Sequence, residues 1–325
     1  MSKRNYVVRR IVQIFILYIA IATMLFALFR AAPGDPLSSF IGTGFTPEQA
    51  QEIRETYGLN DPIWLQYVKY IASALTFSFG RSITSGEPVG AIIGSRVWNT
   101  LVLQGTSIVL AYLVGVPFGA YLAWNRGNIS ERFGIIISLV SRSAPTFWTG
   151  IIAIWLFSLK LNLFPAGSMT SAGVEYSSRL AMYLSLDFLH HLLLPALVQV
   201  AYFFSLPALL MRNSMLEVMN EDFVDFSNLK GLREYVVILK HAARNAILPI
   251  VTAFAIAAGY AIGGSVIIET VFAWPGLGRL MVNSALANDY PVAQGAFLML
   301  AALVLIANFA ADLAYGYLDP RITYE

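Results

Sequence analysis

Residues 11–29 read IVQIFILYIAIATMLFALF, an apolar run that contains no charged side chain. A helix needs about 20 apolar residues, at about 1.5 Å each, to cross about 30 Å of lipid hydrocarbon. The run follows four basic residues, Lys3, Arg4, Arg9 and Arg10, and a secretory signal also begins with positive charge. However, the run is too long for a signal core and lacks a small-residue cleavage site. We therefore interpret it as an uncleaved membrane anchor.

The composition of the whole chain agrees with a membrane protein. The 325 residues are 57% hydrophobic and only 12% charged, and the mean hydropathy is +0.65. Soluble domains carry about 25% charged residues, so the excess apolar surface has to face lipid. The net charge of +2 is too small to indicate a nucleic-acid partner. Because the chain has no cysteine, disulfides and thiolate chemistry are excluded.

Six stretches are long and apolar enough to span a membrane: 8–30, 97–124, 133–158, 193–214, 245–268 and 292–317. None of them alternates between polar and apolar residues as a barrel strand does. The sequence therefore predicts an all-α membrane protein with six transmembrane helices.

The distribution of Lys and Arg predicts the orientation. With the N-terminus in the cytoplasm, twelve basic residues fall on that side and eight on the other, and five of those eight lie in or beside one long segment. Orientation follows the short loops, so both termini are expected to be cytoplasmic.

This topology divides the chain into four parts. We expect a cytoplasmic N-terminus with the first span (1–30), an external segment (31–96), a five-helix core (97–317) with a cytoplasmic loop at 215–245, and a cytoplasmic tail (318–325). The external segment is expected to hold two short amphipathic helices. One starts at the capping signal Thr46-Pro47 and the other after Asp61-Pro62. Whether this segment seals the helix bundle or docks a partner stays open.

One polar stretch interrupts the apolar chain. Residues 221–250 read EDFVDFSNLKGLREYVVILKHAARNAILPI. An apolar residue recurs at every third position from Phe223 to Leu232, which predicts a short amphipathic helix, and Gly231 permits a sharp turn after it. Such a helix either fits a hydrophobic groove on a partner or lies on the membrane surface. Surface helices prefer basic polar faces, whereas this helix carries mainly acids.

Several motifs, in order along the chain, resemble one family. They are APGDPL (32–37), YGLNDPIWLQYVKY (57–70), SGEPV (85–89), NTL (99–101), APTFW (144–148), the stretch at 221–250, ETVFAWPGLGRL (269–280), DYPVAQG (289–295) and LDPRI (318–322). Together they resemble the permease subunits of ABC importers, in the branch that serves dipeptides, oligopeptides and nickel.

The resemblance implies a type I importer permease fold in a prokaryotic cell membrane and a machine of several chains. The implied partners are a second permease, which we expect to be a different chain, two cytoplasmic ATPase subunits that bind ATP and Mg, and an external binding protein. No G-x-x-x-x-G-K-[ST] motif occurs, so this chain is expected to be a transport subunit without enzyme activity, cofactor or metal. The residues expected to couple it to the ATPases are Glu221, Asp222, Phe223, Asp225, Phe226, Lys230 and Gly231.

The coupling segment departs from the family pattern. The family usually has a run similar to R-T-A-R-A-K-G, whereas residues 225–231 read DFSNLKG. Two basic positions have become an acid and an amide, and two small ones have become Phe226 and Leu229. We therefore expect a wider and more basic groove on a dedicated ATPase.

A charge inside the membrane needs compensation. Arg142 lies about ten residues into the third expected span, near the midplane, where a charge costs at least about 2.5 kcal/mol. It either lines the translocation path and meets a substrate carboxylate or carbonyl, or it bonds to Gln104 or to the partner permease. Gln104 is a weaker candidate for the path.

Two further features have open interpretations. Glu269, Trp274, Gly276 and Gly278 belong to the matched ETVFAWPGLGRL segment, and they form either an external gate or a purely structural turn. The adjacent His190 and His191 point in different directions on a helix, so an interfacial or solvated pair is favoured over a metal site.

The function predicted from the sequence is import of di- or oligopeptides, driven by ATP. The same machine carrying oligosaccharides or nickel remains an alternative. An ion-coupled carrier working alone is less consistent with the sequence, because it predicts mid-membrane acids and inverted repeats, which the sequence does not show.

Overall fold

The computed structural model describes residues 3–31, 51, 54–55, 58, 60–263 and 266–318. Regular structure in this part is helical, with one isolated antiparallel bridge between Arg81 and Pro88, as predicted. The motif APGDPL lies outside the described residues, as do most of the helix expected after Thr46 and all of LDPRI except its first residue.

The chain forms two compact units. Unit 1 contains residues 1–100, 275–309 and 323–325, and unit 2 contains residues 101–274 and 310–322. Helices α5 (Val89–Trp124) and α17 (Tyr290–Leu318) contribute residues to both.

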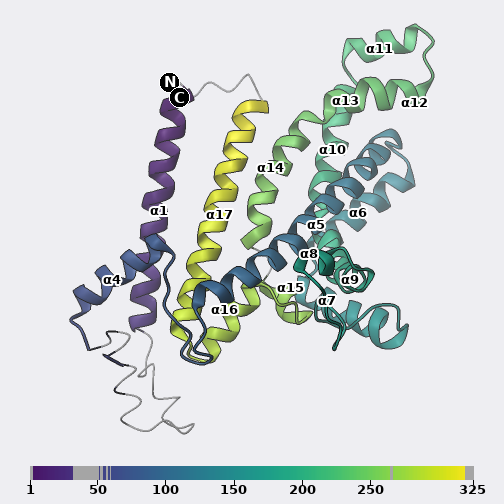
Figure 1. Cartoon of the computed structure of the whole chain (residues 1–325). Helices are drawn as coiled ribbons and strands as arrows, with labels where there is room; N and C mark the ends of the chain where they lie inside the picture. The colour runs from purple at the N-terminus through teal and green to yellow at the C-terminus, as the bar shows by residue number, and fades with distance from the viewer. Residues whose placement is uncertain are drawn as a thin grey trace. The chain divides into compact units, whose positions relative to one another are not determined.

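Unit 1 is built around α1 (Lys3–Ala31), α4 (Ile63–Thr76), α16 (Leu277–Leu286) and the longer part of α17. Helix α4 covers the stretch where Asp61-Pro62 predicts a helix. Figure 1 shows α17 running alongside α1, with α4 crossing α1. Their shared core contains Tyr18, Ala22, Ala74, Leu298 and Ala302. The Tyr18 hydroxyl donates a hydrogen bond to the carbonyl of Ala74 (3.0 Å) and so ties α1 to α4.

A buried carboxylate organises the segment before α5. Asp289, next to the start of α17, accepts hydrogen bonds from the Ser82 hydroxyl and from the backbone N–H groups of Ile83 (3.2 Å) and Thr84 (3.4 Å). The segment 81–88 folds into a turn in which Ser82 N–H bonds to the carbonyl of Glu87 (2.9 Å). Residues more than 200 positions apart are thereby joined within unit 1.

Unit 2 contains the rest of α5 and most of the shorter helices. They are α6 (Ile129–Ser143), α7 (Thr146–Ala153), α8 (Arg179–Tyr183), α9 (Leu186–Phe203), α10 (Ser205–Val218), α11 (Asp222–Leu229), α12 (Glu234–Val236), α13 (Ala243–Ala246), α14 (Leu248–Gly263) and α15 (Val266–Val271). Two π-helical segments, η1 (Ile154–Lys160) and η2 (Val237–Ala242), continue α7 and α12. One core of unit 2 lies around Leu103, Phe188 and Trp274, and a second lies around Tyr112, Met211 and Ile238.

Helices α5 and α10 approach each other closely at two glycines. A Cβ at Gly115 would stand 2.7 Å from the carbonyl oxygen of Phe204, and one at Gly119 would overlap the carbonyl oxygen of Ala208. Glycines four residues apart allow two apolar helices to bring their backbones together. The segment GVPFG at 115–119 therefore sets the distance between α5 and α10.

Four helical segments are long and apolar enough to cross a membrane: Asn5–Ala31, Val89–Trp124, Leu186–Val218 and Tyr290–Leu313. Two bent pairs, Ile129–Ser143 with Thr146–Lys160 and Glu234–Ala246 with Leu248–Gly259, bring the number to six if each pair is one span. These counts hold for the described residues.

The third expected span, 133–158, is a bent pair of helices and not one straight helix. The two helices of that pair meet at 101°, and the break falls at Ala144 and Pro145, which have extended backbone with ψ of 129° and 128°. Proline disfavours helical conformation in the residue before it, so the helix ends at Ser143. In the fifth stretch, Pro249 stands second in α14, after a 50° bend.

Candidate functional site

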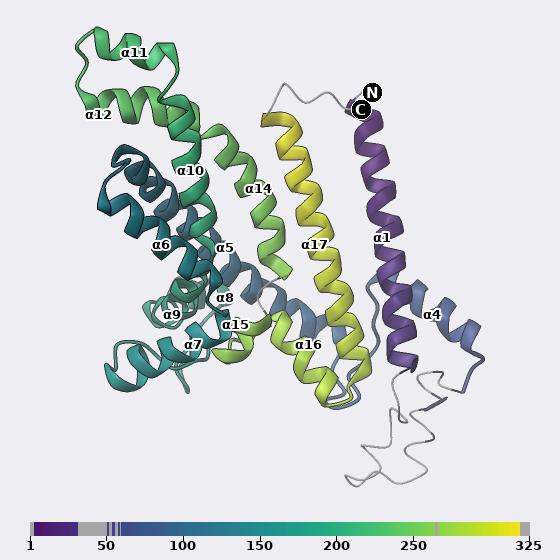
Figure 2. The same ribbon diagram turned by 180° about the vertical axis from the view of Figure 1, so that it is seen from behind.

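Helix α11 presents apolar side chains away from the body of unit 2. Figure 2 shows α11 running alongside α12, beyond the end of α10. Val224 (4% exposed) and Ser227 (7%) are buried, while Phe226 (59%) and Leu229 (85%) are exposed, and α11 packs against η2. The helix is therefore fixed through one face and exposes the other.

Charge surrounds this exposed apolar face. Asp222 and Asp225 lie in the first turn of α11, where carboxylates interact favourably with the helix dipole. The ammonium of Lys230 lies 4.4 Å from the centroid of the Phe226 ring. Gly231 ends the segment with a φ of 72°, a conformation that favours glycine.

The seven predicted coupling residues thus lie together in and around α11. All seven of them are exposed. The sequence groups Phe223 with Phe226 and Leu229, and the structure identifies Val224 and Ser227 as the residues that fix the helix.

Two polar contacts join this region to the helices of unit 2. The indole Nε1 of Trp124, the last residue of α5, donates to Glu234 Oε1 of α12 (2.9 Å). Arg212 of α10 forms an ion pair with the buried Glu131 of α6, and Nε donates at 2.8 Å. Glu131 also accepts from the backbone N–H of Gly127 (2.6 Å). These contacts join α5 to α12 and α6 to α10, and the sequence does not indicate them because pairs so distant leave no local pattern.

Arg142 lies on the last turn of α6, next to the break, and not within a continuous span. Its guanidinium carbon is 4.2 Å from the centroid of the Tyr202 ring in α9. Gln104 is buried, and neither polar atom of its side chain has a hydrogen-bond partner in the described part of the chain. The bond between Arg142 and Gln104, one of the alternatives that the sequence leaves open, is therefore not formed among the described residues.

The segment ETVFAWPGLGRL crosses from unit 2 into unit 1. In unit 2, Trp274 and Glu269 are fully buried, and Trp274 N–H bonds to the carbonyl of Glu269 (2.8 Å). The residue with positive φ in this turn is Ala273 (50°). Gly276 instead has an extended backbone and precedes α16, while Gly278 is buried inside α16.

In unit 1, the start of α16 is attached to α5 by the motif NTL. Asn99 Nδ2 donates to the carbonyl of Pro275 (2.7 Å). Thr100 Oγ1 accepts from the backbone N–H of Leu277 (2.8 Å). The second bond satisfies a backbone N–H group that a helix start leaves without a partner.

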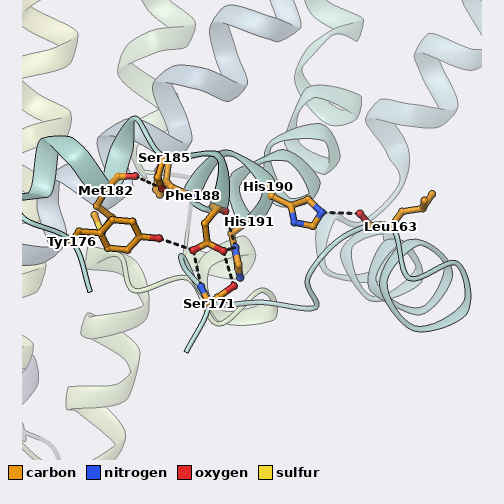
Figure 3. Close-up of polar contacts among 9 residues, drawn as sticks. Leu163, Ser171, Tyr176, Met182, Ser185, Phe188, His190 and His191 are labelled. Atoms are coloured by element: carbon orange, nitrogen blue, oxygen red, sulfur yellow. Dashed lines mark hydrogen bonds and ion pairs between the residues drawn. The ribbon is translucent and has the colours of Figure 1, made fainter. Parts of the chain in front are cut away.

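The loop between η1 and α9 is fastened to the first turns of α9. Asp187 accepts from Ser171 N–H (2.9 Å), Ser171 Oγ (2.6 Å) and the Tyr176 hydroxyl (2.7 Å), as Figure 3 shows. His190 Nε2 bonds to the carbonyl of Leu163 (2.8 Å), and His191 Nδ1 to that of Asp187 (2.8 Å). Each histidine therefore has its own partner.

Comparison with known proteins places this fold in a family. The family model described as "binding-protein-dependent transport system inner membrane component" matches residues 115–324, and a model of the N-terminal region of such components matches residues 3–104. The chain therefore belongs to this family, and it is a permease subunit of an ABC importer.

Two curated relatives match along nearly their whole length. The oligopeptide transport system permease protein AppB of Bacillus subtilis (strain 168) is 36% identical over 321 residues, which cover 98% of this chain and 99% of that protein. The dipeptide transport system permease protein DppB of Escherichia coli (strain K12) is 33% identical, with 99% of each chain covered.

A solved structure supports the fold. A chain of the MetNI methionine ABC transporter, in inward-facing conformations, matches with a TM-score of 0.55 and 19% identity. The match covers 70% of this chain and 96% of that one.

Proposed function

We propose that this permease subunit forms, with a second and different permease chain, the path along which di- or oligopeptides cross the cell membrane. An external binding protein delivers the peptide. Two cytoplasmic ATPase subunits bind ATP and Mg and drive the cycle. The peptide substrate is supported by the names of the two relatives, which are an oligopeptide and a dipeptide permease.

The observation that carries the ATPase contact is the exposed face of α11. Phe226 and Leu229 project from a helix that Val224 fixes against η2. An amphipathic helix with exposed anchors suits a hydrophobic groove on a partner protein. The carboxylates of Glu221, Asp222 and Asp225 favour a groove with a basic rim.

The orientation follows from this contact. The balance of Lys and Arg in short loops favours the same orientation, with both termini on the cytoplasmic side as well. The turn at 81–88 and the loop held by Asp187 then lie outside, on the side of the binding protein.

Motion of the ATPases reaches the membrane helices through side-chain contacts between helices. The bond between Trp124 and Glu234 connects α12 to α5, and the pair of Glu131 with Arg212 connects α6 to α10. Packed helices that move as linked bodies can open a path alternately to either side.

Gentle purification of the chain from its native membrane, with mass spectrometry of everything that accompanies it, tests the proposal. The expected companions are two ATPase subunits, a second permease and a binding protein with a bound peptide. An oligosaccharide or nickel on that binding protein would replace the peptide assignment. A chain that purifies alone and moves solute without ATP would overturn the proposal.

A further inference from the structure

Arg142 is the single charged residue between Phe133 and Leu159, a stretch that spans most of the bent pair. It lies on the last turn of α6, where the chain turns away by 101° into α7. A charge at such a position in an apolar segment marks a functional site with an anionic or polar partner.

The helical periodicity of α6 shows which way Arg142 faces. The buried residues Glu131, Gly134 and Ser138 form one stripe, and Arg142 follows Ser138 by four residues, hence on the same side. The exposed large apolar residues of α6 occupy the opposite side, and they are Ile129, Phe133, Ile136, Ile137, Leu139 and Val140. Arg142 therefore belongs to the packed side of α6 and not to its outer apolar side.

Although it is on the packed side, Arg142 is exposed, because α6 ends one residue later. Tyr202 of α9 covers its guanidinium at 4.2 Å. The adjacent Ser141 hydroxyl donates to the carbonyl of Ala201, which fixes the end of α6 against α9. An aromatic ring on the face of a guanidinium leaves the N–H groups at its edge available.

Within the described residues, the side chain of Arg142 forms no hydrogen bond and no ion pair. The Arg142 guanidinium is therefore a positively charged, planar group that the Tyr202 ring orients and whose N–H groups stay accessible. Such a fork matches a carboxylate, which can accept two parallel N–H···O bonds. Every peptide with a free C-terminus carries this group at neutral pH.

We infer that Arg142, oriented by Tyr202, binds the C-terminal carboxylate of the peptide as it passes the bend between α6 and α7. This inference rests on the proposed function. Arg142 makes the contact, and Tyr202 is a positioning residue that limits the directions in which the guanidinium points.

The test compares two substrate pools in proteoliposomes that contain the whole transporter with its binding protein and ATP. One pool is a mixture of tripeptides with free C-termini, and the other is the same mixture with C-terminal amides. Peptides that the binding protein binds in both forms are followed by mass spectrometry. The quantity compared is the ratio of free-acid import to amide import, in the native permease and in the variant. Any preference of the binding protein for one pool affects both ratios equally and therefore cancels.

Arg142→Gln is expected to lower import of the free-acid pool about tenfold or more relative to the amide pool, since a charge-assisted pair is lost. Arg142→Lys should give a smaller loss, because lysine keeps the charge without the planar fork. Arg132→Gln, which removes an exposed charge from the same helix, should change neither pool. Tyr202→Phe should retain the preference for free acids, and Tyr202→Leu should weaken it through KM more than through kcat.

A second measurement uses the absence of cysteine from the chain. In the Arg142→Cys variant, a water-soluble anionic methanethiosulfonate reagent should label the introduced thiol during ATP-driven transport, and free-acid tripeptides should slow the labelling. This readout does not depend on delivery of the amides.

The outcomes separate the two proposals. If neither pool enters with the native permease, the proposed function fails. If native import occurs but Arg142→Gln lowers both pools equally, or lowers neither, the inference is wrong. If both pools lose import equally and the second permease no longer purifies with the variant, Arg142 belongs to the subunit interface. If the thiol of Arg142→Cys is never labelled, the inference is also wrong.

Discussion

Gly119 of α5 lies directly against the backbone carbonyl of Ala208 in α10, so closely that a single added carbon would overlap the carbonyl oxygen. This oxygen belongs to the backbone and cannot rotate away as the end of a flexible side chain could. The contact therefore limits what residue 119 can be.

The first prediction concerns this contact. Gly119→Ala is expected to lower the free energy of unfolding by about 1–3 kcal/mol, because α10 has to shift to accept the methyl group. Gly105→Ala on the same helix is the matched control, since a Cβ there meets nothing within 4 Å, and it should be neutral or slightly stabilising. Thermal unfolding in detergent measures both, and equal stability of the two variants would contradict the close approach.

The second prediction concerns the exposed face of α11. Phe226→Ala should weaken binding of the ATPase about tenfold or more, as expected for an aromatic anchor in a groove. Phe133→Ala is a matched control, because Phe133 on α6 has the same exposed fraction, 59%. Recovery of ATPase with the tagged permease, and ATP-driven import, measure the effect. Unchanged recovery and import would remove α11 from the contact.

The third prediction concerns the ion pair of Glu131 with Arg212. Glu131→Ala should destabilise unit 2 by about 2 kcal/mol, because Arg212 and the Gly127 N–H lose an acceptor. The double variant Glu131→Ala, Arg212→Ala should cost less than the sum of the two single changes, as contacting residues couple. Thermal unfolding of all four proteins gives the coupling directly, and strict additivity would show that the pair contributes nothing.

The fourth prediction concerns Asp289, the buried acceptor of unit 1. Asp289→Asn should release the turn at 81–88, since an amide cannot accept from Ser82, Ile83 and Thr84 in the same way. Trypsin cleavage after the exposed Arg81 should become several times faster. Asp61→Asn, which removes a carboxylate elsewhere in unit 1, should leave this cleavage unchanged. A cleavage rate unaffected by Asp289→Asn would show that other contacts hold the turn.

Local signals predicted much of this molecule. Apolar length predicted the candidate spans, and Asp61-Pro62 predicted the start of α4. The period of apolar residues around Phe226 predicted α11, and Gly231 has the positive φ that its position predicts. Each depends on residues within a few turns of each other.

What the sequence did not reveal depends on distant partners. Pro145 explains why α6 ends where it does, but the 101° bend also depends on how α6 and α7 pack. Nothing near Arg142 in the sequence indicates Tyr202, which is 60 residues away, and nothing near Ser82 indicates Asp289. The glycines at 115 and 119 indicate a close helix contact, but nothing near them in the sequence indicates that α10 is the partner.

The π-helical segment η2 lies between the exposed helix α11 and the apolar helix α14. A π-helix closes its hydrogen bonds over one residue more than an α-helix does. Residues 237–242 therefore hold a surplus of one residue. Converting η2 into regular α-helix would pass that residue along the axis and rotate α12 by about 100° relative to α13, since an α-helix has 3.6 residues per turn. A small change of hydrogen-bond register in η2 can therefore turn the exposed face of α11 to a new direction, while α12, η2 and α13 stay helical.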